Sequence, residues 1–206
     1  MRYAVAHKRN YSKLSVLGFE KNFHGLSFGT LSCADPEQNK SNYPTFDWPL
    51  APLPKLKYPL SHFEHENRAE EQRCLDVVSQ LIKSQKAEGK DIGAIIIEPI
   101  TSQGNHQATP SFYKKLRAIA AHEGIPFIAD ETKIGVGSTG KMWAHEHWYL
   151  GEHDGGCPDI VTFAGKSGIS GFYSTLDYRV DPHCASFDQD VDFVKLINFG
   201  VIWKEI

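Results

Sequence analysis

Short apolar runs alternate with longer stretches of helical periodicity along this chain. The runs at 92–97 and 126–129 are apolar without alternation, which is typical of parallel strands buried on both faces. Residues 14–19 (LSVLGF) and 158–163 predict two further strands. Strands that alternate with helical stretches predict an α/β fold, in which flanking helices cover a mostly parallel sheet.

Two of the intervening stretches carry the start and stop signals of helices. Residues 64–88 predict a long helix, with acids in its first half, lysines in its last turns and Gly89 after it. A second helix begins after Thr109, an N-cap residue, has Pro110 at its first position and ends at Gly124. The two apolar faces consist of Leu75, Val78, Leu81 and Ile82, and of Phe112, Leu116, Ile119 and Ala120. The second helix and its flanking strands predict a right-handed crossover.

Three segments between these elements predict loops. Residues 35–61 are rich in proline and predict an extended loop, which either covers its own subunit or serves as a lid or interface arm. Residues 135–140 (GVGSTG) lack the spacing of both glycine-rich nucleotide motifs, so they predict a flexible turn or a subunit-contact loop. His145 and His147 have a ligand spacing for a strand, but no third ligand stands nearby. We therefore favour a packed subunit-contact segment over a metal site.

Composition and charge narrow the function classes. The chain has 206 residues, of which 41% are hydrophobic and 23% charged, and a net charge of −3. This is ordinary globular composition, and the charge favours neither nucleic acid nor an acidic membrane surface as a partner. No apolar run approaches the length of a membrane span. The cysteines lie apart and predict reduced thiols of an intracellular protein: Cys33, Cys74, Cys157 and Cys184.

Three of the apolar runs lead into side chains that can do chemistry. Glu98 and Asp130 follow or end two of the runs, and Lys166 comes shortly after the third. Because ligands of an open parallel sheet bind at the carboxyl ends of its strands, we expect these side chains in one crevice. Two acids and a lysine suit pyridoxal phosphate (PLP), where a lysine forms the Schiff base and an acid pairs with the pyridinium nitrogen.

Each of these residues also has an ordinary structural explanation. Asp130 follows a buried strand, so its carboxylate needs a partner, which is a pyridinium N–H, a helix N-terminus or an arginine. Lys166 has small neighbours and is either a desolvated nucleophile or a solvated loop lysine. Glu98 either steers substrate or makes a structural ion pair. Phe23 offers a ring that stacks on a planar cofactor or packs in the core.

Six segments taken together are specific to one family. They are FHG at 23–25, PTFDWPLAPLPKLKYPL at 44–60, IIIEPI at 95–100, IADE at 128–131, GSTGKMWAHEHW at 137–148 and PDIVTF at 158–163. Over residues 14–179 the chain resembles the 4-aminobutyrate aminotransferases, which are class III, PLP-dependent aminotransferases. The resemblance implies the large domain of a fold type I enzyme, which is a homodimer and transfers the amino group of 4-aminobutyrate to 2-oxoglutarate.

The resemblance assigns roles to several residues. Phe23 corresponds to the residue that stacks on the cofactor ring, and Glu98 to the acid near the substrate. Asp130 corresponds to the partner of the pyridinium nitrogen. Lys133 stands where the family has a glutamine that meets the phenolic oxygen of the cofactor.

At two other positions the chain departs from the family. Leu26 replaces an arginine that holds a substrate carboxylate, and an aliphatic side chain cannot replace a guanidinium. An ungapped alignment puts Gly165 where the Schiff-base lysine belongs, so Lys166 is one residue late. A shift within the loop restores the lysine, whereas on a strand one residue reverses the side-chain direction.

These similarities and departures lead to three functional hypotheses. The first is a 4-aminobutyrate aminotransferase represented by a central fragment, with residues 1–179 as part of the large domain and 180–206 as a divergent tail without family match. The second is a non-catalytic remnant, and the third is a class III transaminase for another ω-amino acid. The expected partners are amino-acid and keto-acid substrates, and a second copy or a full-length homologue in a dimer. The family implies the mitochondrial matrix in a eukaryote and the cytoplasm otherwise.

Overall fold

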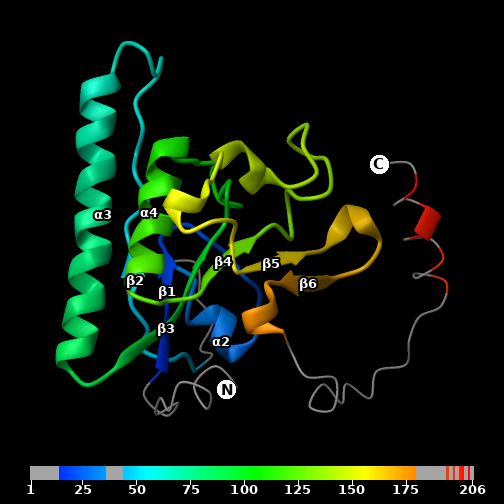
Figure 1. Cartoon of the computed structure of the whole chain (residues 1–206), viewed down its shortest axis with the longest axis horizontal. Helices are drawn as coiled ribbons and strands as arrows, with labels where there is room; N and C mark the ends of the chain where they lie inside the picture. The colour runs from blue at the N-terminus through cyan, green and yellow to red at the C-terminus, as the bar shows by residue number, and fades with distance from the viewer. Residues whose placement is uncertain are drawn as a thin grey trace.

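The computed structural model describes residues 14–35 and 44–179, with isolated positions in the remaining C-terminal part. The segment before residue 14, Cys184 and most of the predicted tail at 180–206 lie outside the described residues. A six-stranded sheet with the order β2-β1-β3-β4-β5-β6 forms the centre (Figure 1). Its strands are β1 (Leu14–Phe19), β2 (Leu50–Ala51), β3 (Asp91–Ile97), β4 (Phe127–Asp130), β5 (Ile160–Phe163) and β6 (Gly171–Ser174).

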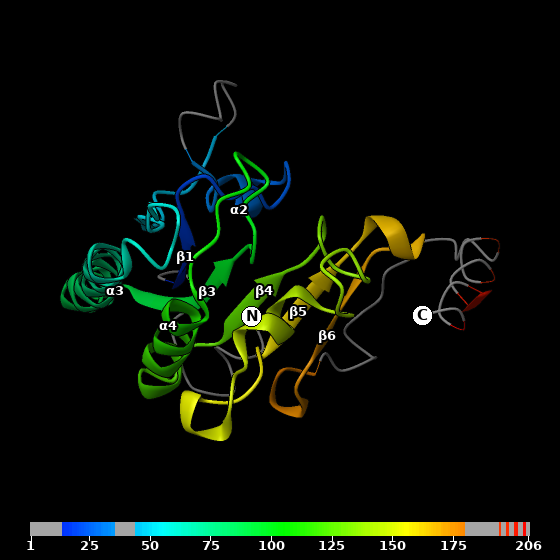
Figure 2. The same cartoon turned by 90° about the horizontal axis from the view of Figure 1, so that it is seen from above.

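All neighbouring strands are parallel except β5 and β6, which pair antiparallel. Helix α3 (Glu64–Ala87) connects the β1–β2 side of the sheet with β3, and α4 (Pro110–His122) connects β3 with β4. Both crossovers advance across the sheet in the same direction, so right-handed connections place both helices on one face (Figures 1 and 2). The predicted mostly parallel sheet with flanking helices is confirmed.

The hydrophobic core lies between this sheet face and the two helices. In β3 the side chains of Ile95 and Ile97 are completely buried, and so is Phe127 in β4. From the helices, Val78 and Leu116 are also completely buried, as their predicted apolar faces require. The core additionally contains Leu17, Phe19, Cys74, Leu75, Ile82, Phe112, Tyr113, Ala120, Trp148 and Val161. No helix within the described residues combines the length and apolar character that a membrane span needs.

A buried ion pair joins α4 to the start of β5. Arg117, only 6% exposed, donates from Nη1 and Nη2 to the two carboxylate oxygens of Asp159 at 2.9 and 3.0 Å. Asp159 Oδ2 also accepts a hydrogen bond from the backbone N–H of Phe127 at 2.8 Å. This ion pair therefore holds the first residues of β4 and β5 together, and so helps to align the carboxyl ends of the two strands.

The proline-rich segment differs from its prediction in one respect. Leu50 and Ala51 form an edge strand, where the N–H of Gly18 donates to Pro49 O and the N–H of Glu20 to Ala51 O. A proline is tolerated beside such a strand because an edge position needs hydrogen bonds on only one side. The sequence carried no signal for α2 (Phe28–Leu31) or β6, because α2 is a single turn and most of β6 is exposed, so neither has an extended hydrophobic pattern.

The histidine-rich segment is not a strand. Residues Ala144–Trp148 form a 3-10 helix, and Trp148 packs in the core of this chain with its ring stacked on Tyr113 at a centroid distance of 4.2 Å. Trp148 is therefore a core residue of this chain, and the subunit contact predicted for the segment stays a prediction. His147 Nε2 lies 3.1 Å from the backbone oxygen of Thr139, within the glycine-rich loop. The described residues contain no group of three histidine, cysteine or acidic side chains arranged to hold a metal ion.

Candidate active site

The predicted site residues lie at the carboxyl ends of three adjacent strands. Glu98 directly follows β3, and Asp130 is the last residue of β4. Lys166 lies in a 3-10 turn, Gly165–Ser167, just after β5. Because β3, β4 and β5 are parallel neighbours, these ends share one edge of the sheet, as the sequence predicted.

Asp130 is buried and accepts hydrogen bonds from three separate segments. His24 Nδ1 lies 2.6 Å from Oδ2, while Oδ1 accepts from the hydroxyl of Thr162 at 2.9 Å and the N–H of Thr132 at 3.1 Å. Burial acts to raise the pKa of this carboxyl, but the hydrogen bonds from His24 and Thr132 outweigh it and lower the pKa. Among the described residues its partner is thus a histidine, neither a helix N-terminus nor an arginine.

His24 is the site residue that sequence reasoning missed. Its side chain is 1% exposed, and Nε2 is buried without a hydrogen-bond partner in the described part of the chain. A buried polar atom without a partner is costly, so it marks a place where a ligand group or water completes the structure. The available signal was its position in the FHG motif beside Phe23. Thr162 was missed as well, although it lies in the third predicted strand.

Glu98 connects the segment around Phe23 to the loop after β3. Its Oε2 accepts hydrogen bonds from the N–H of Phe23 at 2.9 Å and the N–H of Ser102 at 3.1 Å. The Glu98 N–H in turn donates to Asn22 Oδ1 at 2.6 Å. Glu98 is 2% exposed, and this burial raises its pKa. These partners are neutral donors, so Glu98 forms no ion pair with the residues that the structure describes; its catalytic role stays a prediction.

Phe23 and Lys133 are in direct contact. Lys133 lies in the turn after β4, and its Nζ is 4.9 Å from the centroid of the half-buried Phe23 ring. This is a cation–π distance. Phe23 is therefore a platform at the edge of the site, adjacent in sequence to His24 and bonded through its N–H to Glu98.

Lys166 is exposed, and no hydrogen bond or ring contact joins it to Asp130 within residues 14–35 and 44–179. The preceding Gly165 has φ +75°, and a Cβ there would lie 3.5 Å from Thr132 O. A larger residue at position 165 thus fits in space but requires a strained backbone. Leu26, at the position of the family's arginine, is 76% exposed.

Glu131, directly after Asp130, has a different role. It is completely buried and accepts hydrogen bonds from the N–H groups of Ala144 and His145 and lies 2.7 Å from His145 Nδ1. This carboxylate therefore anchors the 3-10 helix Ala144–Trp148 onto the end of β4. The predicted turn at 135–140 lies between these two anchored segments.

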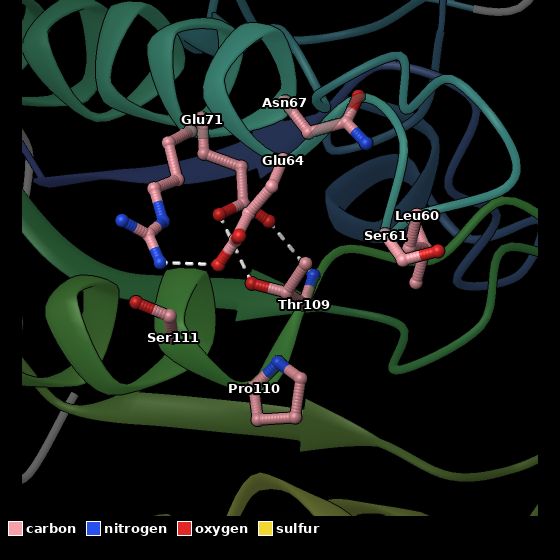
Figure 3. Close-up of a pocket in the computed structure, with 9 residues that line it drawn as sticks. Leu60, Ser61, Glu64, Asn67, Glu71, Thr109, Pro110 and Ser111 are labelled. Atoms are coloured by element: carbon pink, nitrogen blue, oxygen red, sulfur yellow. Dashed lines mark hydrogen bonds and ion pairs between the residues drawn. The ribbon is translucent and has the colours of Figure 1, made fainter.

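Two cavities lie beside α4, away from Asp130. The larger, about 570 Å³, is shown in Figure 3, where Glu71 of α3 accepts hydrogen bonds from the N–H and hydroxyl of Thr109 at 2.8 and 3.0 Å. Glu71 thus holds Thr109, the N-cap residue of α4, whose side chain makes no capping hydrogen bond to the helix. The second cavity, about 380 Å³, lies between Tyr58, Ile100 and Trp148. Neither cavity is lined by His24, Asp130 or the two candidate lysines.

The residues at the strand ends fit PLP. Asp130 Oδ2 has His24 as its one partner among the described residues, so this oxygen retains an acceptor position for a pyridinium N–H. Phe23 offers an aromatic face, and the buried Nε2 of His24 needs a partner. Lys133 and Lys166 supply amines near the same edge.

Comparison with known proteins now identifies the family. A family model described as aminotransferase class-III matches residues 1–178. The chain belongs to the class III aminotransferases. A 4-aminobutyrate aminotransferase of Dictyostelium discoideum is 44% identical over 94% of this chain and 38% of the relative. The mitochondrial 4-aminobutyrate aminotransferase of Homo sapiens is 42% identical over 80% of this chain and 33% of the relative.

Solved class III structures share the fold. A lysine aminotransferase from M. tuberculosis is 27% identical with a TM-score of 0.71, over 84% of this chain and 38% of that structure. An ω-transaminase from Thermomicrobium roseum is 21% identical with a TM-score of 0.74, over 99% of this chain and 47% of that structure. At this identity the similarity supports the fold alone. The chain thus spans less than half the length of these relatives.

These comparisons confirm the predicted family, its fold and its cofactor class, because class III aminotransferases depend on PLP. The family acts on amino-acid and keto-acid substrates. The mammalian relatives are mitochondrial proteins. The roles of Phe23, Glu98, Asp130, Lys133 and Lys166 stay predictions.

Proposed function

We propose that this chain carries the central part of a PLP-dependent aminotransferase that acts on 4-aminobutyrate. The reaction transfers the amino group of 4-aminobutyrate to 2-oxoglutarate and yields succinate semialdehyde and glutamate. The observation that carries the proposal is the buried carboxylate of Asp130 at the end of β4. Its lowered pKa and remaining acceptor position on Oδ2 match what a protonated ring nitrogen requires.

Bound PLP supplies an electron sink for the carbanion at the substrate carbon. Asp130 keeps a proton on the ring nitrogen, because its lowered pKa maintains the carboxylate in its charged form. Phe23 would pack against one ring face of the cofactor, and Glu98, held by the N–H groups of Phe23 and Ser102, would border the substrate side. A lysine at this edge would hold the cofactor covalently and move the proton at the substrate carbon; the sequence predicts Lys166 for this role, one residue after the position of the family's lysine.

Two observations support a second candidate, a remnant that binds PLP weakly or not at all. Gly165 stands at the family's lysine position, and Leu26 stands exposed at the position of its arginine. Leu26 also supports a third candidate, a transaminase for another ω-amino acid, because an aliphatic side chain in place of the guanidinium implies a changed substrate pocket.

Further proposals follow from the family. The family resemblance implies a homodimer, so the proposed partner of this chain is a second copy or a full-length homologue. In a eukaryote the mitochondrial matrix is the proposed compartment, and otherwise the cytoplasm. Residues 1–179 form part of the large domain, and 180–206 form a separate, divergent tail.

The proposed function is tested with the purified 206-residue chain. The chain is saturated with PLP, dialysed, and treated with 4-aminobutyrate in a single turnover. We expect retained PLP and the release of succinate semialdehyde in an amount comparable to the bound cofactor. Retained PLP without product supports a different substrate or a remnant, which a panel of ω-amino acids separates. If no PLP is retained, the chain is not an aminotransferase by itself.

A further inference from the structure

The two lysines near the strand ends differ in what holds them. Both are exposed, so burial does not distinguish Lys133 from Lys166. Lys166 follows a glycine with positive φ in a short turn. Lys133 instead lies in the turn immediately after Asp130, and its Nζ rests 4.9 Å from the centroid of the Phe23 ring. Within the described residues, Lys133 is thus the lysine in contact with the segment that pairs with Asp130.

The contacts of Phe23 connect Lys133 to the buried acids. The N–H of Phe23 donates to Glu98 at 2.9 Å, and its neighbour His24 lies 2.6 Å from Asp130. The Phe23–His24 dipeptide is therefore held at both of its residues. Lys133 lies over a platform that is itself anchored to two buried carboxylates, which limits where its amine can be.

A stacked ligand brings an aldehyde into the reach of this amine. Rings stacked on a phenylalanine have centroid separations of about 4.5–7 Å, which includes the distance at which Nζ of Lys133 now lies. A planar aldehyde that stacked on Phe23 and bonded to Asp130 would therefore take the place of the ammonium over the ring, with its carbonyl near the displaced amine. Small rotations of the long lysine side chain then suffice for contact.

We infer that Lys133, rather than Lys166, is the amine of this chain that bonds covalently to PLP; this inference rests on the proposed cofactor and adds to it the identity of the lysine. The ammonium of Lys133 first releases a proton to solvent. Its neutral nitrogen adds to the aldehyde carbon of PLP, and the carbonyl oxygen leaves as water, so that a carbon–nitrogen double bond remains. No electrons are exchanged with another reagent.

The test maps the reduced adduct. The 206-residue chain and the variants Lys133→Arg and Lys166→Arg are each incubated with a stoichiometric amount of PLP, dialysed, assayed for retained PLP, reduced with borohydride and digested for mass spectrometry. Arginine preserves the charge and the long side chain but does not condense with the aldehyde, so the two variants form a matched pair.

Lys141 provides an internal control in the same protein. Its Nζ lies 4.6 Å from the ring centroid of Tyr149, which is 64% exposed, so it shares the cation–π contact without the buried acids. We expect labelling of Lys133 to exceed that of Lys141 by roughly tenfold or more, because bound PLP has a high effective concentration at one amine. Phe23→Ala should reduce Lys133 labelling to the level of Lys141.

The outcomes separate the inference from the proposed function. An adduct on Lys133 that disappears in Lys133→Arg and persists in Lys166→Arg supports the inference. Retained PLP with an adduct on Lys166 overturns the inference but leaves the proposed function in place. Equal labelling of Lys133 and Lys141 shows reaction from solution and also overturns it. If no variant and no wild-type chain retains PLP, both the inference and the proposed function fail.

Discussion

Asp130 and Glu131 are neighbouring acids at the end of β4, both buried and each about the same distance from a histidine Nδ1, yet they serve two different regions. Glu131 receives all its hydrogen bonds from Ala144 and His145 in one 3-10 helix. Asp130 receives its own from His24, Thr132 and Thr162, which lie in three separate segments. Glu131 thus fixes one loop to the end of β4, whereas Asp130 connects the end of β4 to the distant segments that contain His24 and Thr162.

The comparison shows that the number of hydrogen bonds does not separate an anchor from a binding group. Each carboxylate has three donors among the described residues. What differs is the origin of the donors and the state of the histidine. Nε2 of His24, the histidine beside Asp130, is buried without a hydrogen-bond partner in the described part of the chain. The side chain of Glu131, in contrast, is completely buried. An incomplete network at the edge of a parallel sheet is typical of a ligand site.

The largest expected effect is the loss of the anchor. Glu131→Ala leaves two backbone N–H groups and the His145 ring without their acceptor, so the free energy of unfolding should fall by about 3–5 kcal/mol. Urea denaturation measures this. Glu146→Ala is the matched control, because Glu146 accepts from the Trp143 N–H at the same 3-10 helix but is exposed. Its cost should stay below about 1 kcal/mol. Equal losses for both variants would contradict the anchoring role.

The next effect concerns the binding acid. Asp130→Asn removes a charge-assisted partner of the ring nitrogen, so PLP binding should weaken roughly tenfold to hundredfold. The free energy of unfolding should fall by only about 1–2 kcal/mol, since the amide oxygen still accepts hydrogen bonds. Equilibrium dialysis measures the binding. Asp91→Asn, at the opposite end of β3, is the control and should leave PLP binding unchanged. Unchanged binding in Asp130→Asn would remove Asp130 from the site.

A smaller effect distinguishes Asp130 from Glu98 by the sign of its pH dependence. The pKa of Asp130 is lowered from 3.8, so its stabilisation is present above pH 3.8 and is lost as the pH falls through the lowered value. The pKa of Glu98 is raised from 4.5, so its stabilisation is present below pH 4.5 and is lost as the pH rises through the raised value.

Free energies of unfolding measured against pH test this difference. Asp130→Asn should flatten the decrease below pH 3.8, and Glu98→Gln should flatten the decrease above pH 4.5. The wild-type chain supplies the reference curve. If both variants change the same side of the curve, one of the two pKa directions is wrong.

The smallest expected effect is at Leu26, which lies outside both carboxylate networks. Leu26→Arg restores the family's side chain at a position that is 76% exposed, so the free energy of unfolding should change by no more than about 0.5 kcal/mol. Binding of 4-aminobutyrate to the PLP-loaded chain should improve a few-fold, as exposed charge pairs contribute little. Leu26→Lys is the control for charge without the planar guanidinium. No gain with either variant would favour a different substrate.

Much of the fold was predictable because its signals are local. The predicted helix at 64–88 corresponds to Glu64–Ala87, and the N-cap Thr109 with Pro110 marked the start of α4. The apolar runs became β3, β4 and β5 with the expected parallel pairing. The strands β2 and β6 were missed, because β2 has only two residues and β6 is mostly exposed, so both are defined by their pairing partners rather than by a hydrophobic pattern.

The site was predictable in outline but not in detail. The position of Asp130 and Glu98 after buried strands indicated a crevice, because parallel strands end at one edge. The partner of Asp130 was not predictable, since His24 lies 106 residues away in the chain. A carboxylate in a sequence looks the same whether a histidine, an arginine or a helix N-terminus will neutralise it.

The sequence by itself determined the two long helices, the strands β1, β3, β4 and β5, the family and the set of candidate acids and lysines, because periodicity, caps and motifs are properties of adjacent residues. Only the tertiary structure decided that Asp130 pairs with His24, that Glu131 anchors the histidine-rich turn and that Lys133 rests on Phe23. The physical reason is that burial makes each carboxylate require donors, and the folded chain alone sets which donors come within hydrogen-bonding distance.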